Sequence, residues 1–247
     1  MDTESRLQEP LRDDHLDLNV AEGTRTRPSI AHLMLWTACS ALYLAIHGAF
    51  FSGSHLMAFG PALKMVWSIS VGATLAGAIL LVWERVHRGG PVMRQPGHWF
   101  LVLQAVLVCL SFSVLVGARL FSLTVESATH SGILAAWGAC SLVMAIGYAV
   151  GCLRNPSLRW RLVFASVMLA YFFQLLGYLL LMLPPSNFLS VIWSVDVLIG
   201  RGAVLIVLGV AIGERIKGIR RDWLHWVGVT TFAADGLIQV VAGMMNA

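Results

Sequence analysis

Asp196, Arg201 and Asp235 are charged residues that lie inside runs of the sequence that are otherwise apolar. A charged side chain at the centre of a membrane-spanning helix costs about 2.5–3.5 kcal/mol on an insertion scale. Three such residues would together cost roughly 8–10 kcal/mol, which is comparable with the whole stability of a typical domain. We therefore expect each of them to be paired or hydrated or, for the two aspartates, protonated.

Depth and direction suggest partners for these charges. With a rise of about 1.5 Å per residue, Arg201 would lie roughly 20 Å and Asp235 roughly 18 Å from opposite sides of a membrane, so both are near its midplane. We expect these two residues to pair across adjacent antiparallel helices. Asp196 lies five residues before Arg201, about 140° around a helix, and we expect it to meet Arg119 instead.

Uncharged polar side chains extend these positions into strips. Thr231, Asp235 and Gln239 share one helical face because they are four residues apart, and Gln104 and Gln174 lie in two further apolar runs. Such strips normally face the interior of a bundle, where they line a path for a proton, an ion or a small polar solute. They also serve as contacts that only hold helices together, so both interpretations stay open. The candidate intramembrane polar site comprises Asp196, Arg201, Asp235, Arg119, Gln104, Gln174, Gln239 and Thr231.

Histidines at shared depths raise the possibility of axial haem ligation. His32, His98 and His225 would lie near one side of the membrane, and His47 and His130 near the other. No HxxxH pair, CxxCH attachment motif or di-iron spacing accompanies them. We therefore predict no cofactor and no metal, with haem as a less favoured alternative.

Motifs of familiar enzyme chemistry are missing from the sequence. It contains no GxSxG, HExxH, Walker lysine loop or GxGxxG pattern. The sequence therefore indicates no catalytic residue and favours a protein that is not an enzyme.

Composition indicates the elements that position these residues. Of the 247 residues, 57% are hydrophobic and only 12% are charged, so a water-soluble domain would have too little polar surface. Seven apolar runs are each long enough to cross a hydrocarbon core of about 30 Å, which needs about 20 helical residues. Without water to satisfy the backbone, such runs form helices. We predict an all-α membrane protein, a seven-helix bundle with helices over 29–52, 61–83, 98–122, 130–153, 160–183, 188–212 and 223–245.

Basic residues are confined to alternate loops. Arg and Lys occur before the first predicted helix and after the second, fourth and sixth, whereas the other three loops contain none. This alternation predicts a cytoplasmic N-terminus and an outward C-terminus, in the plasma membrane or a bacterial inner membrane. Residues 1–28 carry seven acids and four arginines, so we expect a disordered, polar cytoplasmic tail before one transmembrane domain over 29–247. The basic residues form no patch with interleaved aromatics, so the expected partner is the lipid bilayer and not nucleic acid, with protein partners unknown.

Small residues four apart predict close helix contacts. They occur as Ser68, Gly72 and Ala76 in the second helix, Gly147 and Gly151 in the fourth, and Gly209 and Gly213 in the sixth.

The helix ends predicted on the side of the basic loops carry similar residues. The second and sixth helices both end in a Glu-Arg pair, and we expect Glu84 and Glu214 to pair with neighbouring arginines. Tryptophans at the same side suit the headgroup region, namely Trp83, Trp99, Trp160, Trp223 and Trp226.

These features together indicate a multi-pass membrane protein whose polar interior moves or senses a proton, an ion or a small polar solute. A structural or assembly subunit is the alternative from a different functional class. A redox protein that carries haem is the third hypothesis.

Overall fold

The computed structural model describes residues 29–51, 61–88, 93–122, 129–183 and 188–245. All regular secondary structure in these ranges is helical, and each helix is long and apolar enough to cross a membrane. The helices are α1 (Ile30–Phe51), α2 (Pro61–Arg88), α3 (Pro96–Ser122), α4 (Thr129–Arg154), α5 (Leu158–Leu181), α6 (Phe188–Ile216) and α7 (Trp223–Met245).

The predicted helical architecture is confirmed, and two helices are longer than predicted. Helix α2 continues to Arg88 and α6 to Ile216, whereas the apolar runs end at residues 83 and 212. Hydropathy finds where an apolar run stops, but backbone hydrogen bonding continues into the polar residues that follow. The residues added to α6 include Glu214.

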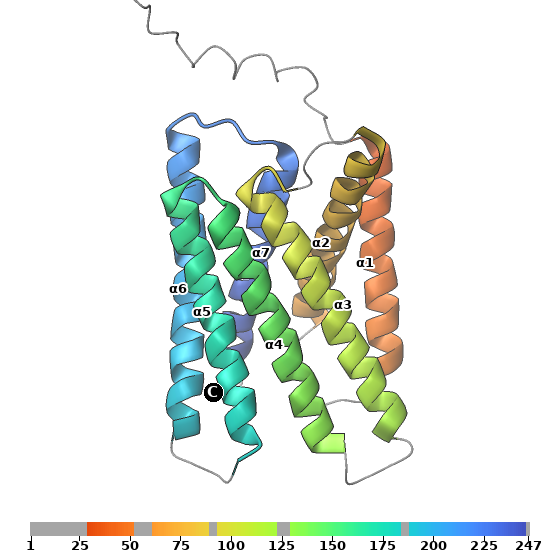
Figure 1. The fold of residues 1–247 in the computed structure, drawn as a ribbon. Helices are drawn as coiled ribbons and strands as arrows, with labels where there is room; N and C mark the ends of the chain where they lie inside the picture. Colours follow the sequence, from red (N-terminus) through yellow and green to blue (C-terminus); the bar gives the residue numbers. More distant parts are fainter. Residues whose placement is uncertain (1–28, 52–60, 89–92, 123–128, 184–187, 246–247) are drawn as a thin grey trace, which may run out of the picture.

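The helices stand side by side in a bundle (Figure 1). Contacts join α1 to α2, α3 to α4, α4 to α5 and α5 to α6, while α7 touches α2, α3 and α6. The ends of α2, α4 and α6 and the starts of α3, α5 and α7 gather at one end, at the top of Figure 1, which we call the basic end. The C-terminal end of α7 lies toward the other end, which we call the opposite end.

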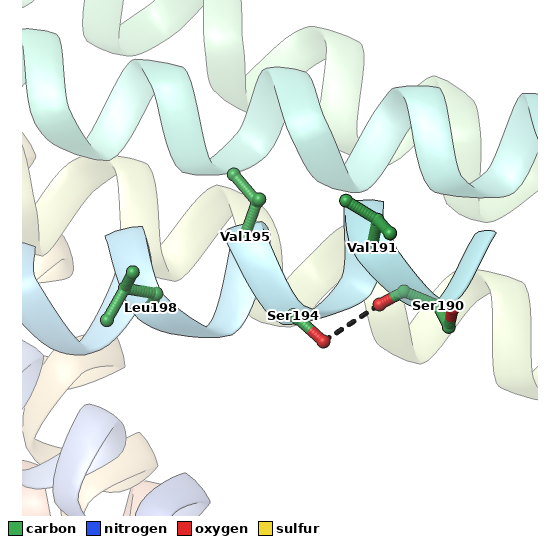
Figure 2. A pocket seen from close by; sticks show the side chains of 5 residues that line it. All are labelled: Ser190, Val191, Ser194, Val195 and Leu198. Carbon is green, nitrogen blue, oxygen red and sulfur yellow. Dashed lines mark hydrogen bonds between the residues drawn. The ribbon is translucent and has the colours of Figure 1, made fainter. Parts of the chain in front are cut away.

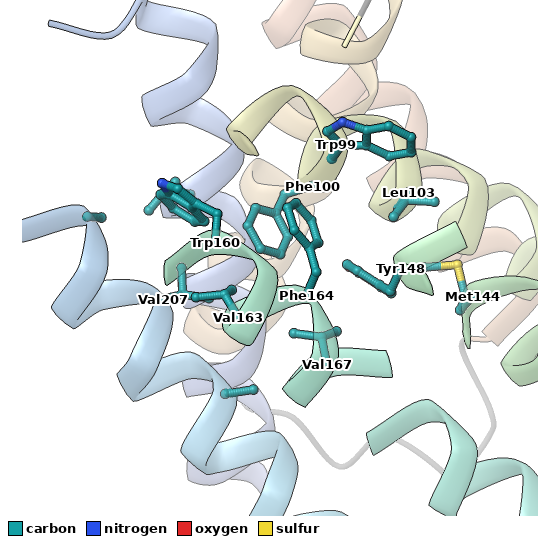
Figure 3. Packing of buried hydrophobic residues seen from close by; sticks show 13 residues of the cluster. Trp99, Phe100, Leu103, Met144, Tyr148, Trp160, Val163, Phe164, Val167 and Val207 are labelled. Carbon is teal, nitrogen blue, oxygen red and sulfur yellow. The ribbon is translucent and has the colours of Figure 1, made fainter. Parts of the chain in front are cut away.

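The buried apolar core lies in the half of the bundle next to the basic end. Figure 3 shows Phe100, Phe164 and Trp160 close together, with the ring centroid of Phe100 5.2 Å from that of Phe164 and 6.2 Å from that of Trp160. All three side chains are fully buried. In the described part of α6, four of the buried apolar residues lie in the segment from Ala203 to Ala211. Ile192 is the one buried apolar residue in the half of this helix that is farther from the basic end. The packing that defines this bundle is therefore concentrated at one end.

Glycines set two of the closest helix contacts. A methyl group on Gly228 of α7 would overlap the carbonyl oxygen of Gly97 in α3, and one on Gly97 would overlap the carbonyl oxygen of His225. Gly72 of α2 lies equally close to Ser40 of α1. The absence of a side chain is what allows these backbones to approach.

The small residues predicted to mark contacts divide into two groups. At Gly72, Gly147 and Gly151, a built methyl group would meet a neighbouring helix within 3.2 Å or less. At Gly209 and Gly213 it would meet nothing within 4 Å. The predicted close packing is thus confirmed in α2 and α4 and is wrong for α6 within the described structure.

Candidate functional site

After the end of α6, the chain reverses direction and returns toward Glu214, the last carboxylate of that helix. Gly218 adopts a left-handed conformation with φ of 71°, which glycine tolerates without steric cost. Its N–H donates to the carbonyl of Arg215, and the N–H of Ile219 donates to the carbonyl of Glu214. This pattern is a Schellman cap, and it reverses the chain so that Arg221 returns to Glu214.

Glu214 is a buried carboxylate with charged and neutral donors around it. Arg221 donates from Nη2 to Oε1 at 2.6 Å and from Nε to Oε2 at 3.1 Å. Trp160 of α5 donates from Nε1 to Oε1 of Glu214 at 2.7 Å. The two-pronged arginine contact is a strong charge-assisted geometry, so the buried charge is compensated. The predicted pairing of Glu214 with a nearby arginine is confirmed, and Trp160 is fully buried inside the bundle.

Asp222 joins the start of α7 to the start of α3. Its Oδ1 accepts the backbone N–H of His225 at 2.8 Å, which makes Asp222 the N-cap of α7. Both of its carboxylate oxygens lie 3.0 Å from His98 Nε2, and its own N–H donates to Gln95 Oε1 at 3.2 Å. Burial alone would raise the pKa of Asp222, but the His98 contact and the His225 N–H together hold the pKa below its ordinary value of 3.8. Asp222 is therefore ionised at neutral pH.

His225 is fully buried at the centre of this end. Its Nδ1 accepts the backbone N–H of Gly97 at 2.9 Å, so the neutral ring carries its proton on Nε2. That Nε2 has no hydrogen-bond partner in the described structure and lies 4.0 Å from Glu214 Oε2. His98 Nδ1 is likewise buried without a partner. We call His98, Trp160, Glu214, Arg221, Asp222 and His225 the basic-end network.

The imidazole and carboxylate groups of the basic-end network are able to bind and release protons. It brings two imidazoles and two carboxylates from α3, α6 and α7 and their connections into contact. Among the described residues, no three His, Cys, Asp or Glu side chains are grouped so that they could hold a metal ion.

A second polar layer lies deeper in the bundle. Thr231 Oγ1 of α7 donates to Gln104 Oε1 of α3 at 3.1 Å, and both side chains are buried. Ser70 of α2 donates to the carbonyl of Thr231 at 3.5 Å. Two members of the predicted polar site are therefore brought together, and they connect three helices.

Asp235 lies one turn farther along α7 than Thr231. One carboxylate oxygen accepts Gln239 Nε2 at 3.1 Å. The carboxylate also interacts electrostatically with the phenol groups of Tyr43, Tyr148 and Tyr171, which come from α1, α4 and α5. The hydroxyl of Tyr148 is buried without a hydrogen-bond partner in the described structure. Asp235 therefore faces the interior of the bundle.

The predicted Arg201–Asp235 pair is not formed. Arg201 is exposed on α6 and makes no hydrogen bond or ion pair with any described residue. The depth argument did not fix how α6 is rotated. The buried residues Ala203 and Val207 show that α6 turns Arg201 away from the core.

The remaining predicted polar residues lie on other contacts. Gln174 Oε1 of α5 accepts the hydroxyl of Ser141 of α4 at 3.3 Å. Asp196 is half-buried on α6 and interacts electrostatically with Tyr171. Arg119 is exposed in the last turn of α3, and its pairing with Asp196 stays a prediction.

The histidines proposed as haem ligands are not arranged alike. His32 Nδ1 accepts the N–H of Ser29 at 3.0 Å, and its ring stacks on Trp223. His47 lines a hollow of about 10 Å³ between α1 and α2, and the side chain of His130 lies outside the described part of the structure. Haem binding by any of these residues stays a prediction.

Sequence reasoning missed the basic-end network as a unit. It named His98 and His225 only as haem candidates, and it left out Arg221 and Asp222. One signal was available, because an Asp three residues before the helical His225 is an N-cap pattern. Comparison of the chain with protein-family models, curated proteins and solved structures finds no match.

Proposed function

We propose that this protein moves or senses a proton, or a small cation, within the membrane and that Asp235 is the site that binds it. The observation that carries the proposal is an interior carboxylate without a basic partner in the described structure. An unpaired carboxylate in an apolar environment is stabilised by a bound proton, a cation or water. Intramembrane ionisable residues that face a bundle interior typically mark such pathways.

Helix α7 supports a path from the basic end to this carboxylate. His225, Thr231 and Asp235 follow one another along α7, and ten residues of helix span about 15 Å. His225 belongs to the basic-end network, and Thr231 to the Gln104 layer. Titratable and hydroxyl groups at successive depths are what a proton relay needs.

A small hollow lies beside one of the phenols that interact with Asp235. Tyr43 lines this hollow of about 10 Å³. That volume is close to the minimum that holds one water molecule. A proton, or a cation small enough to follow water, would fit a space of this size.

A structural subunit is the second candidate function. The observation in its favour is that the Glu214 contacts link α5, α6 and the α6–α7 connection with strong hydrogen bonds. Such contacts hold helices together without any transport.

Proton flux into liposomes tests the two candidates. The purified protein would be reconstituted with a pH-sensitive dye inside the vesicles, and flux would be driven by a potassium diffusion potential. We expect Asp235→Asn to assemble normally and to reduce proton flux at least about tenfold. Asp196→Asn is the matched control, because it removes an aspartate from another helix, and it should keep most of the flux.

Two outcomes would contradict transport through Asp235. The first is an unchanged flux in the Asp235→Asn variant, and the second is wild-type flux no higher than that of empty liposomes. Loss of assembly in Asp235→Asn, together with inactive wild-type protein, would favour the structural subunit. The predicted cytoplasmic N-terminus would make the basic-end network the cytoplasmic mouth of the path.

A further inference from the structure

One side of α6 is exposed along the length of the helix. We call the residues Ser194, Leu198, Arg201, Leu205, Gly209 and Ile212 the outer face of α6; they recur every three or four residues and all are exposed. Figure 2 shows Val195 directed toward α5 and Ser194 directed to the other side of α6. In this single chain, the outer face would contact lipid.

Arg201 lies near the middle of that face. It is 13 residues after Phe188 and 15 residues before Ile216, so each end of α6 is roughly 20 Å away. An arginine near a helix end extends its side chain to the headgroups, but this distance exceeds its reach. Arg201 has no hydrogen-bond or ion-pair partner among the described residues. A charge at this depth requires an acceptor, and the described part of the chain does not provide one.

The surface of α6 near Arg201 has open space beside its glycines. Gly202, Gly209 and Gly213 have nothing within 4 Å of a built methyl group, in contrast to Gly72 in the α1–α2 contact. A hollow of about 280 Å³ lies on α6 and is lined by residues that include Ser190, Ser194 and Leu198 (Figure 2). Small residues of this kind let transmembrane helices approach closely.

We propose that the outer face of α6 binds a transmembrane helix of a different protein that carries an aspartate or glutamate at mid-depth. The carboxylate would accept hydrogen bonds from the Arg201 guanidinium, and the partner backbone would pack along the open glycines. Charge complementarity selects this occupant, because an unpaired arginine needs a negative partner. This inference is independent of the function proposed for Asp235.

A second copy of the chain is a poor occupant for the same surface. A two-fold axis along the bilayer normal would bring the Arg201 side chains of both copies to one depth, where like charges repel. Asp196 lies about 140° from Arg201 around α6, and Asp235 faces the interior of the bundle. Neither carboxylate can therefore reach the Arg201 of a neighbouring copy.

Energy transfer in liposomes tests the proposal with designed helices. The full chain would carry an acceptor dye at its N-terminus, and Leu/Ala peptides of about 24 residues would carry a donor dye and one central Asp or Asn. We expect the Asp peptide to bind about tenfold more tightly than the Asn peptide. Arg201→Gln should abolish this preference, and Arg201→Lys should retain it because the charge remains.

Matched measurements keep the proposal falsifiable. Arg154→Gln removes an exposed arginine at the basic end and should leave the Asp preference intact. Equal binding of the Asp and Asn peptides to the wild-type chain would overturn the proposal, whether or not Arg201→Gln folds. Stronger energy transfer between two copies of the chain than between the chain and the Asp peptide would also overturn it.

Discussion

At the scale of single residues, Glu214 shows what a buried charge in this bundle requires. Its carboxylate is satisfied by Arg221 and Trp160, and only 5% of its side chain is exposed. Removing one partner of a buried ion pair leaves the other charge without compensation. If Glu214 is replaced, the charge left without compensation is that of Arg221, whose side chain is 21% exposed.

Replacing this carboxylate gives a direct prediction. Glu214→Gln should lower the free energy of unfolding by about 3 kcal/mol, because Arg221 loses its charged partner. Denaturant titration of the detergent-solubilised protein, followed by circular dichroism, would measure it. Glu84→Gln is the matched control, because half-buried Glu84 also precedes an arginine near the end of α2, and its loss of stability should stay below about 1 kcal/mol. Equal losses in the two variants would contradict the role assigned to Glu214.

Residue-level prediction failed where it required the rotation of a helix. Gln104 and Thr231 meet in the interior of the bundle, whereas Arg201 and Asp235 form no pair. Depth depends only on the number of residues from a helix end. Rotation depends on which neighbouring side chains fill the core, and that information is spread over several helices.

At the scale of the helices, hydropathy was enough to find all seven elements in the described chain. It could not find the ends of α2 and α6, because a helix continues beyond its apolar run. It also could not tell which glycines pack, since Gly147 in α4 and Gly209 in α6 have the same four-residue spacing but different surroundings.

The α3–α7 contact gives a prediction at this scale. Gly97→Ala should reduce stability by about 3 kcal/mol, because the new methyl group would overlap backbone atoms that cannot rotate away. Gly117→Ala in the same helix meets nothing within 4 Å, so it should be neutral or stabilising by up to about 1 kcal/mol. Thermal unfolding of both variants in detergent measures the difference, and an equal effect would refute the close contact.

At the scale of the whole molecule, packing is uneven along the membrane normal. The aromatic cluster around Phe100 and the basic-end network occupy the same half of the bundle. No single apolar run reveals this, because every run is hydrophobic along its full length. The uneven packing follows from how large side chains of α3, α4 and α5 meet.

Hydrogen exchange should report this difference. Amides of residues 203–214 in α6 should exchange at least about tenfold more slowly than those of residues 189–200, because the former lie beside the core. Mass spectrometry of the protein in detergent micelles would compare the two halves within one helix. Equal protection, or faster exchange near the basic end, would show that the packing is even.

The contacts at the basic end join residues that are far apart in the sequence, so they can form only late in biosynthesis. Gly97 and His225 are 128 residues apart, and His98 and Asp222 are 124 apart. A ribosome that adds 5–20 residues per second needs on the order of ten seconds to cover that distance. Throughout this interval α3 is complete while its partners on α7 do not yet exist. Until α7 has been made, the polar residues at the start of α3 must therefore be in contact with the insertion machinery, other helices or water.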